Sequence, residues 1–329
     1  MLERVLATLA SHGVVEVVLS LGYRPDAFLA AYPDGAAAGV RLAYAVEAEP
    51  LDTAGAIRFA ADHAGFSGTL IVVNGDVLTD LDIGALVDFH HRTGAVATIA
   101  LTPVEDPSRF GVVPTDAEGR VLAFVEKPPI DEAPTNEINA GTYVFEHEVL
   151  DRIPTGRRVS VERETFPALA AEGRLFARSS RDYWLDTGTP ASYLQAHRDL
   201  LSGRRAGLPA PGAVEVAPGV WTLGTARIDG DVRARSLVGS GASVAAGGFV
   251  EGSVVGAGAV VEGGARVQGS VLLAGVRVGV GASVVDSVVG FGATVGPGAE
   301  LSGKSVVGDG AEVPAGGRLA GCRFPDVGP

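Results

Sequence analysis

Two aspartates are the strongest candidates for chemistry in this sequence, because each stands where a predicted strand ends. Asp76 follows the apolar run Leu70-Ile-Val-Val73, and Asp186 follows Tyr183-Trp184-Leu185. In an α/β domain, a buried strand that ends in a carboxylate delivers it to the sheet edge where ligands bind. Two such carboxylates could hold Mg²⁺, which takes its other ligands from water and phosphate. Each aspartate could instead cap the helix that follows it, and the residues alone leave both interpretations open.

Three further segments carry groups that suit a phosphorylated ligand. Glu126 and Lys127 close the predicted strand 121–125, where a lysine suits a phosphate and a carboxylate suits a sugar hydroxyl; an exposed ion pair is the alternative. Small residues at 139–141 enter a strand, as a close approach of ligand to backbone requires, although an ordinary turn would explain them equally well. The turn at 50–55 leads into a helix N-terminus, which favours polar or anionic contacts.

The elements that must position these groups follow from the hydrophobic pattern of the first 200 residues. Strands alternate with helices, which predicts a mostly parallel, doubly wound α/β sheet, and residues 110–145 add short antiparallel strands at one edge. Thr53 is the expected N-cap of the third helix. Helices are expected from Leu2 until Gly13 ends the first, and at 25–31, 54–64, 82–91, 161–171 and 190–201; strands are expected at 14–19, 42–46, 70–76, 95–101, 110–113, 121–126 and 142–145.

A glycine-rich repeat dominates the last third of the chain. Of 46 glycines, most lie after residue 210. Similar units begin at Val238, Val255, Leu272, Val289 and Val307, so they are spaced by 17, 17, 17 and 18 residues, and an aliphatic residue returns about every sixth position. This period predicts a hexapeptide solenoid with three short strands per coil. A flexible glycine-rich tail is the alternative, but such a tail would not keep this phase.

Composition limits the class of protein. The 329 residues carry a formal net charge of −13, which argues against a nucleic-acid partner. No apolar run is long enough to span a bilayer, so no membrane partner is expected. The single cysteine, Cys322, excludes a disulfide framework and favours a cytoplasmic location. All histidines precede the repeats, which argues against an acyltransferase that uses a histidine base in the solenoid.

Six motifs in a fixed order give the chain a specific resemblance. It resembles the sugar-1-phosphate nucleotidyltransferases, most closely the mannose-1-phosphate guanylyltransferases with a C-terminal β-helix, and its repeats resemble the left-handed parallel β-helix of the hexapeptide family. The expected domains are a nucleotidyltransferase domain at 1–203, a linker at 204–219 and the β-helix at 220–329. The motifs are Glu-Pro-Leu-Asp-Thr-Ala-Gly (49–55), Asn-Gly-Asp (74–76), Arg-Phe-Gly-Val (109–112), Phe-Val-Glu-Lys-Pro (124–128), Asn-Ala-Gly (139–141) and Trp-Leu-Asp-Thr-Gly-Thr-Pro (184–190).

The resemblance implies transfer of a nucleotidyl group from a nucleoside triphosphate to a sugar 1-phosphate, with GTP and mannose 1-phosphate giving GDP-mannose as the leading pair. It implies that Asp76 and Asp186 hold Mg²⁺ and that Lys127, the third catalytic residue, meets the phosphate of the sugar. The solenoid would serve structure or homo-oligomer assembly. Residues implied in nucleotide binding are Leu51, Asp52, Thr53, Ala54, Gly55 and Gly75; those implied in sugar-phosphate binding are Gly111, Glu126, Lys127, Asn139 and Gly141.

Two departures from the family pattern change these expectations. Asp52 replaces the middle glycine of the family's Leu-Gly-Thr-Ala-Gly turn. The family's N-terminal Gly-Gly-x-Gly-Thr-Arg loop, which cradles the triphosphate, occurs nowhere in the sequence. By comparison with the family, we expect the first strand and this loop to be missing, most simply through a start codon assigned too late. The expected consequences are weak activity and unpaired sheet edges, and the alternative is an inactive regulatory or scaffold homologue.

Overall fold

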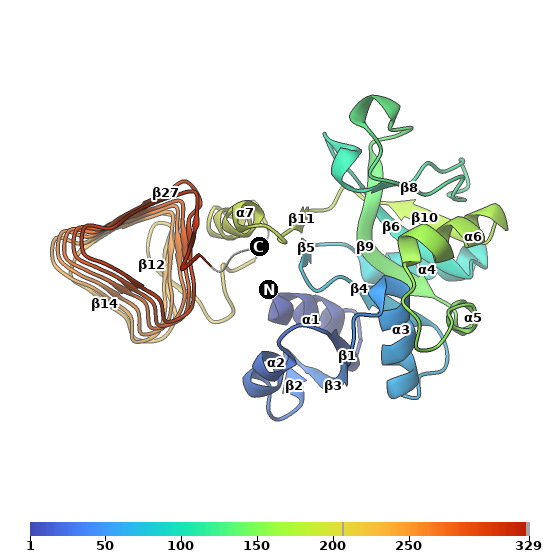
Figure 1. Cartoon of the computed structure of the whole chain (residues 1–329), viewed down its shortest axis with the longest axis horizontal. Coiled ribbons are helices and arrows are strands. Elements are labelled where there is room, and N and C mark those ends of the chain that lie inside the picture. Colours follow the sequence, from blue (N-terminus) through green and yellow to red (C-terminus); the bar gives the residue numbers. More distant parts are fainter. Residues whose placement is uncertain (206, 327–329) are drawn as a thin grey trace. The chain divides into compact units, whose positions relative to one another are not determined.

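The computed structural model describes residues 1–205 and 207–326 (Figure 1). The chain divides into two compact units, Met1–Leu185 and Asp186–Pro329. The first is an α/β unit and the second contains a parallel β-solenoid, which confirms the predicted fold class. The predicted linker contains residue 206 and the predicted β-helix domain ends with 327–329, and these four residues lie outside the described part of the chain.

Two sheets form the framework of the first unit. One has the order β10-β6-β9-β7-β8, with β4 also paired to β9, and the other has the order β1-β3-β2. Strands β1 and β3 pair in parallel, as do β6 and β10, whereas β9 runs antiparallel to β4, β6 and β7. The strands are β1 (Glu16–Leu21), β2 (Ala36–Ala37), β3 (Val40–Val46), β4 (Leu70–Val73), β6 (Ala97–Pro103), β7 (Gly111–Val112), β8 (Val125–Glu126), β9 (Glu137–Phe145) and β10 (Leu175–Ser179).

This arrangement refines the expected sheet in two ways. Strand β9 begins at Glu137, well before the predicted 142–145, and lies inside the sheet because it pairs with strands on both sides. Strands β1 and β4 belong to different sheets, and among the described residues each pairs with a strand on one side only. The expectation that a central strand is missing stays a prediction.

The helices cover these sheets and mostly start where local signals place them. Pro25 and Pro190 stand at the first positions of α2 and α7, where a proline costs no hydrogen bond, and both helices match their predicted bounds. The predicted helix 161–171 is instead a π-helical turn (Val161–Thr165) that continues into α6. The helices are α1 (Leu2–Ser11), α2 (Pro25–Ala31), α3 (Asp52–His63), α4 (Ile83–Thr93), α5 (His147–Asp151), α6 (Phe166–Ala171) and α7 (Pro190–Leu201), with short 3₁₀ turns at Pro107–Arg109 and Ile130–Glu132.

The core of the first unit is centred on β9. Tyr143 and Phe145 stack with ring centroids 5.6 Å apart, and both rings meet the edge of Phe166 from α6. All three side chains are almost fully buried. Because β9 also carries Asn139 and Gly141, this aromatic packing fixes the strand that holds two of the predicted ligand-binding residues.

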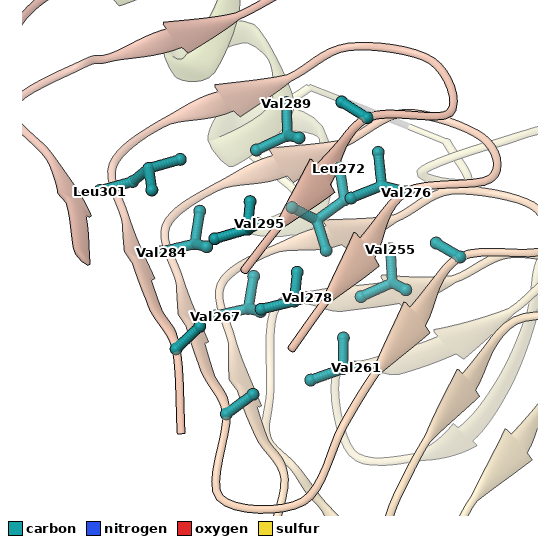
Figure 2. Packing of buried hydrophobic residues seen from close by; sticks show 14 of the residues in the cluster. Val255, Val261, Val267, Leu272, Val276, Val278, Val284, Val289, Val295 and Leu301 are labelled. Atoms are coloured by element: carbon teal, nitrogen blue, oxygen red, sulfur yellow. The ribbon is translucent and has the colours of Figure 1, made fainter. Parts of the chain in front are cut away.

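The solenoid of the second unit consists of three ladders of parallel strands, each forming one face, and β12 is added to the first ladder antiparallel to β13. Aliphatic residues such as Val255, Val261 and Val267 point inward and are fully buried (Figure 2). The first face holds β12 (Val214–Ala217), β13 (Val220–Thr222), β16 (Ser236–Val238), β19 (Val254–Val255), β22 (Val271–Leu272), β25 (Val288–Val289), β28 (Val306–Val307) and β31 (Arg323–Phe324). The second holds β14 (Arg227–Ile228), β17 (Ser243–Val244), β20 (Val260–Val261), β23 (Arg277–Val278), β26 (Thr294–Val295) and β29 (Glu312–Val313). The third holds β15 (Asp231–Val232), β18 (Phe249–Glu251), β21 (Arg266–Gln268), β24 (Ser283–Val285), β27 (Glu300–Ser302) and β30 (Arg318–Ala320).

Helix α7 belongs to the second unit. Arg198 donates a hydrogen bond of 2.7 Å to Asp286 in the solenoid, and Leu201 packs in a cluster with Ala213 and Leu237. The sequence had placed this helix in the first domain. No helix in the described part of the chain is long and apolar enough to cross a membrane.

Candidate active site

Asp76 and Asp186 flank the same small sheet. Asp76 precedes β5 (Val77–Thr79), and Asp186 is the last residue of β11 (Trp184–Asp186), which pairs with β5. The backbone N–H of Asp80 donates to the carbonyl oxygen of Tyr183 at 3.0 Å, which joins the end of β5 to the start of β11. The two strands are therefore antiparallel, and the start of β5 lies opposite the end of β11.

Neither aspartate caps a helix, so the structure excludes the alternative that the sequence left open. The N-cap of α4 is Asp82, whose Oδ1 accepts from the N–H of Ala85 at 2.9 Å. The N-cap of α7 is Thr189, which forms a capping box with Ser192. Asp186 instead accepts a hydrogen bond from the N–H of Gly188 at 2.7 Å, within the turn that follows β11.

The carboxylates of Asp76 and Asp186 suit Mg²⁺ better than they suit a metal ion that is enclosed by protein ligands alone. The residues that the structure describes include no group of three or more His, Cys, Asp or Glu side chains arranged to hold a metal ion. Mg²⁺ requires only one or two carboxylates, because it keeps waters and takes substrate phosphates as its remaining ligands. Asp76 and Asp186 each supply one carboxylate, the ligand type that this requirement names.

Asn74, Asn139 and Gly141 come together at a bulge in β9. The N–H of Asn74 donates to the carbonyl oxygen of Gly141 at 2.8 Å. Gly141 has φ = +74°, and a Cβ there would lie 2.7 Å from Nδ2 of Asn74, so both the backbone conformation and the space favour glycine. The Oδ1 of Asn139 accepts from the N–H of Gly141 at 2.9 Å, and its Nδ2 donates to the buried hydroxyl of Tyr143 at 2.9 Å. Burial raises the pKa of Tyr143, which keeps this hydroxyl protonated.

Gly111, Glu126 and Lys127 form a second group on the neighbouring strands. Gly111 of β7 pairs with Glu126 of β8, and a Cβ at Gly111 would overlap the ring of Phe124. The Nζ of Lys127 lies 3.5 Å from Oε1 of Glu126, so the ion pair that the sequence left as an alternative is present. The Lys127 side chain is nevertheless 62% exposed, and such a pair is weak enough for a phosphate to compete. Because β7 also pairs with β9 at Val112 and Ile138, this group lies beside Asn139.

The predicted nucleotide turn packs on a segment that the sequence did not connect to it. The N–H groups of Ala54 and Gly55 both donate to the carbonyl oxygen of Val159, at 2.9 and 3.2 Å. A Cβ at Gly55 would lie 2.6 Å from the carbonyl oxygen of Arg157. Close packing of α3 against residues 157–159 therefore requires glycine at position 55, and this requirement needs no ligand.

Thr53 and Leu51 are likewise engaged by protein groups. Thr53 donates from Oγ1 to Glu162 at 2.7 Å and accepts from the N–H of Val161 at 2.8 Å, so it joins two segments instead of capping α3. The predicted cap was wrong: Leu51 holds the N-cap position, and its N–H donates to Oε2 of Glu47 at 2.9 Å. These partners lie up to 109 residues away in sequence, a separation that local sequence signals do not report.

Asp52 occupies a backbone conformation that explains why the family has glycine there. Its φ is +62°, in the left-handed region that residues with a Cβ seldom adopt, although aspartate tolerates it better than most. Its Oδ1 accepts from the N–H of Thr53 at 3.0 Å, and its Oδ2 lies 3.7 Å from Nε of Arg158. Gly75, by contrast, has no heavy atom within 4 Å of the position of a Cβ. Asp52 thus adopts a backbone conformation that glycine adopts freely, and it adds a negative charge to the turn.

His90 on α4 is held by protein groups in the core. His90 is 1% exposed, with Nδ1 2.8 Å from Oγ1 of Thr98 and Nε2 3.1 Å from Oε1 of Glu146. Burial lowers the pKa of His90, and the nearby Glu146 carboxylate partly opposes this effect. His90 is therefore a satisfied core residue that stabilises the junction of α4, β6 and the end of β9.

Comparison with known protein families accounts for both units. Residues 1–203, more than half of the chain, match the family described as Nucleotidyl transferase. The chain belongs to the nucleotidyl transferase family, a family of enzymes. Residues 232–324 match a second family, described as the GMPPB C-terminal domain, which covers most of the solenoid.

Individual relatives of this chain are named as guanylyltransferases or as a uridylyltransferase. A mannose-1-phosphate guanylyltransferase of Mycobacterium tuberculosis is 41% identical over 77% of this chain and 70% of that protein. A UTP–glucose-1-phosphate uridylyltransferase of Synechocystis sp. is 36% identical over 67% of this chain and 60% of that protein. The catalytic subunit beta of the mannose-1-phosphate guanylyltransferase of Dictyostelium discoideum is 38% identical over 57% of this chain and 52% of that protein. The chain thus spans only part of the length of each relative.

Solved structures support the same fold. The crystal structure of HddC from Yersinia pseudotuberculosis aligns with a TM-score of 0.51 and 28% identity, over 59% of this chain and 82% of that chain. The same values hold for HddC complexed with GMP-PN.

Proposed function

We propose that this protein transfers the guanylyl group of GTP to mannose 1-phosphate, which gives GDP-mannose and pyrophosphate. The observation that carries this proposal is the 41% identity to a mannose-1-phosphate guanylyltransferase over 77% of the chain. The spatial grouping of Gly111, Glu126, Asn139 and Gly141 on adjoining strands supports it, because a sugar phosphate needs several polar groups on one surface.

The proposed roles of the acidic residues follow from their position and chemistry. Asp76 and Asp186 would hold Mg²⁺, because each places a carboxylate, the ligand type that this ion prefers, next to the paired strands β5 and β11. When bound, this ion neutralises charge on the α-phosphate of the nucleotide. Lys127 binds the phosphate of the sugar and directs one of its oxygens toward the α-phosphorus, opposite the departing pyrophosphate. No protein nucleophile is required, so these residues act by alignment and charge.

The remaining residues are proposed to bind the substrates. Glu126 accepts hydrogen bonds from sugar hydroxyls. Gly111 and Gly141 act by letting Phe124 and Asn74 pack closely against the backbone of β7 and β9. Asn139 already bonds Gly141 and Tyr143, so its role is to hold the bulge of β9 in shape. The turn at 51–55 and Gly75 bind the nucleotide, with Thr53, Ala54 and Gly55 acting through their packing on residues 157–162.

The choice between guanine and uracil is argued from relatives whose names give different activities. The uridylyltransferase of Synechocystis sp. is nearly as similar as the guanylyltransferases, which makes UTP with glucose 1-phosphate the second candidate pair. Guanine is preferred because the guanylyltransferase relatives include bacterial, amoebal and plant proteins, and because HddC has been solved with GMP-PN. The alternative of an inactive scaffold has no support among the comparisons. The expectation of weak activity stays a prediction.

A nucleotide and sugar panel tests the proposal. The full chain is incubated with Mg²⁺, inorganic pyrophosphatase and each of GTP, UTP and dTTP, paired with mannose 1-phosphate or glucose 1-phosphate, and the nucleotide sugars are separated by chromatography and identified by mass. We expect GDP-mannose as the main product. UDP-glucose as the main product would replace the proposed pair by the second one, and no nucleotide sugar above the enzyme-free background would refute both.

A further inference from the structure

A bulge in β9 contains Gly141 and follows directly on Asn139. The pairing of β6 with β9 shifts register between Ile99 and Leu101, so that residues 140–142 of β9 lie opposite a single residue of β6. A bulge re-aims the groups of the strand that carries it, and bulges are common beside active sites. The hydrogen bonds that the carbonyl oxygens of this bulge accept therefore show which segments it holds.

Two consecutive carbonyl oxygens of the bulge accept from two separate motifs. The carbonyl oxygen of Ala140 accepts from the indole N–H of Trp184 at 2.9 Å. The carbonyl oxygen of Gly141 accepts from the backbone N–H of Asn74 at 2.8 Å. Each donor stands two residues before one of the two proposed metal carboxylates. The bulge thus holds both of the segments that lead to these carboxylates.

The segment of Trp184 depends on this contact more than the segment of Asn74 does. Asn74 follows directly on β4, all four residues of which pair with β9. Strand β11 has only three residues and pairs with β5, which is equally short. A two-stranded sheet of this size is marginally stable by itself. The position of β11 therefore depends on the side chain that ties it to β9.

The indole of Trp184 is fixed by its neighbours. Its ring centroid lies 5.6 Å from that of Phe110, with the two ring planes at 78°, which is an edge-to-face contact. The indole also packs against a cluster that includes Leu81 and Ala140. The carbonyl oxygen of Phe110 accepts from the N–H of Lys127 at 3.0 Å, so the same aromatic contact joins β11 to the residue proposed to bind the sugar phosphate.

Packing alone would not require an N–H group at position 184. A phenylalanine would fill much of the same space, whereas the N–H of a half-buried indole has to find an acceptor. The acceptor on β9 fixes β11 at one place along that strand. The N–H of Gly188 donates to Oδ1 of Asp186 at 2.7 Å, so the carboxylate is oriented within the turn that follows β11. A shift of β11 would therefore carry this carboxylate with it.

We propose that Trp184 is the positioning residue of Asp186. Its indole N–H holds β11 on the bulge of β9, and β11 carries the carboxylate of Asp186 to the place where it binds a divalent cation. The inference rests on the proposed function, because it takes the role of Asp186 from there. In this role Trp184 touches neither the cation nor the reacting atoms, so losing its N–H weakens cation binding without removing a ligand.

Titration of the full chain with Mn²⁺ tests the proposal, with the electron paramagnetic resonance signal of the free ion as the readout. Mn²⁺ takes the same carboxylate ligands as Mg²⁺, and the binding that depends on Asp186 is the part that Asp186→Asn loses. Trp184→Phe keeps an aromatic ring and removes the N–H. We expect it to raise the Mn²⁺ dissociation constant about five- to tenfold, which is the effect of one hydrogen bond.

Two further variants separate the N–H from the packing. Trp184→His keeps a five-membered ring with an N–H in the equivalent position and loses the second ring, so at pH 8 its Mn²⁺ dissociation constant should stay within about twofold of the wild-type value. A role in packing alone predicts the opposite order, with Trp184→His the weaker binder. Trp221→Phe, the same change at the other tryptophan of the chain, is the matched control and should have no effect.

The Mg²⁺ dependence of nucleotide-sugar formation gives a second readout. Positioning predicts that Trp184→Phe needs about five- to tenfold more Mg²⁺ than the wild type for its half-maximal rate. A merely structural role predicts a rate that is lower by the same factor at every Mg²⁺ concentration, because it changes only the fraction of folded protein.

The contrary outcomes are equally definite. Equal Mn²⁺ dissociation constants for Trp184→Phe and the wild type would overturn the proposal, as would wild-type binding no tighter than that of Asp186→Asn. Far-UV circular dichroism checks the fold of each variant; where Trp184→Phe does not fold, Trp184→His decides, since a loss as large as that expected for Trp184→Phe, despite its N–H, would overturn the proposal. A wild type that makes no nucleotide sugar but shows the expected order of Mn²⁺ binding would refute the proposed function and leave this inference standing.

Discussion

The contact between α3 and residues 157–159 makes Gly55→Ala the most sharply defined substitution in the first unit. The new Cβ would lie 2.6 Å from the carbonyl oxygen of Arg157 and 2.9 Å from Cβ of Leu51. The first of these neighbours is backbone, so α3 and the 157–159 segment must separate by several tenths of an ångström. Overpacking of this kind costs about 1–3 kcal/mol.

The separation also strains hydrogen bonds. The N–H groups of Ala54 and Gly55 share the carbonyl oxygen of Val159, and the N–H of Val159 donates to Leu51 at 3.0 Å. Weakening one or two such bonds costs about 1 kcal/mol more. We therefore expect Gly55→Ala to lower the free energy of unfolding of the first unit by about 2–4 kcal/mol.

Urea unfolding followed by tryptophan fluorescence measures this loss. Trp184 lies in the first unit and Trp221 in the second, so a Trp221→Phe background makes the signal specific for the first. Gly75→Ala is the control, because no heavy atom lies within 4 Å of its Cβ position, and it should change stability by less than about 0.5 kcal/mol. Equal stability of the two variants would refute the packing explanation of Gly55.

Three further substitutions probe separate parts of the account. Lys127→Ala should lower kcat/KM for the sugar 1-phosphate about 10- to 100-fold, because it removes one charge-assisted hydrogen bond, and the unfolding midpoint should not change. An unchanged kcat/KM would exclude Lys127 from phosphate binding. Asp52→Gly should stabilise the first unit by about 0.5 kcal/mol and Asp52→Ala should destabilise it, because only glycine adopts φ = +62° freely. The reverse order of stability in urea unfolding would contradict the idea that the backbone at residue 52 is strained. The pKa of His90 is lower in the folded protein than in the unfolded chain, so neutral His90 stabilises the fold fully above the unfolded pKa of about 6.5. This contribution to the free energy of unfolding is lost as the pH falls below that value. The free energy of unfolding of His90→Gln should therefore depend less on pH in this range than that of the wild type, and parallel profiles would contradict the pKa shift.

Sequence patterns predicted the parts of the fold that local signals determine. Pro25 and Pro190 mark the starts of their helices, and the six-residue period of aliphatic residues predicts the coils of the solenoid, because both signals act over a few residues. The extent of β9 was missed at its start, since Glu137 and Asn139 interrupt its apolar pattern. Strand β10 was missed because Leu175-Phe-Ala is too short a run to stand out after a helix.

The candidate site depended more on long-range packing than the sequence could report. The sequence left open whether Asp76 caps α4, and the hydrogen bond from the N–H of Ala85 to Asp82 shows that Asp82 is the cap. Thr53 looked like a cap, but its hydroxyl bonds residues more than 100 positions away. Such pairings arise from the way that the strands assemble, and no local pattern encodes them.

The measurement that tests the central claim most directly is formation of GDP-mannose from GTP and mannose 1-phosphate by the full chain, with Asp76→Asn as the comparison. Asp76→Asn keeps the size of the side chain and removes the charge that a divalent cation requires. We expect Mg²⁺-dependent GDP-mannose from the wild type, and a loss of at least about 100-fold in Asp76→Asn at unchanged stability. The absence of GDP-mannose in the wild-type reaction, or equal product from Asp76→Asn, would contradict the account.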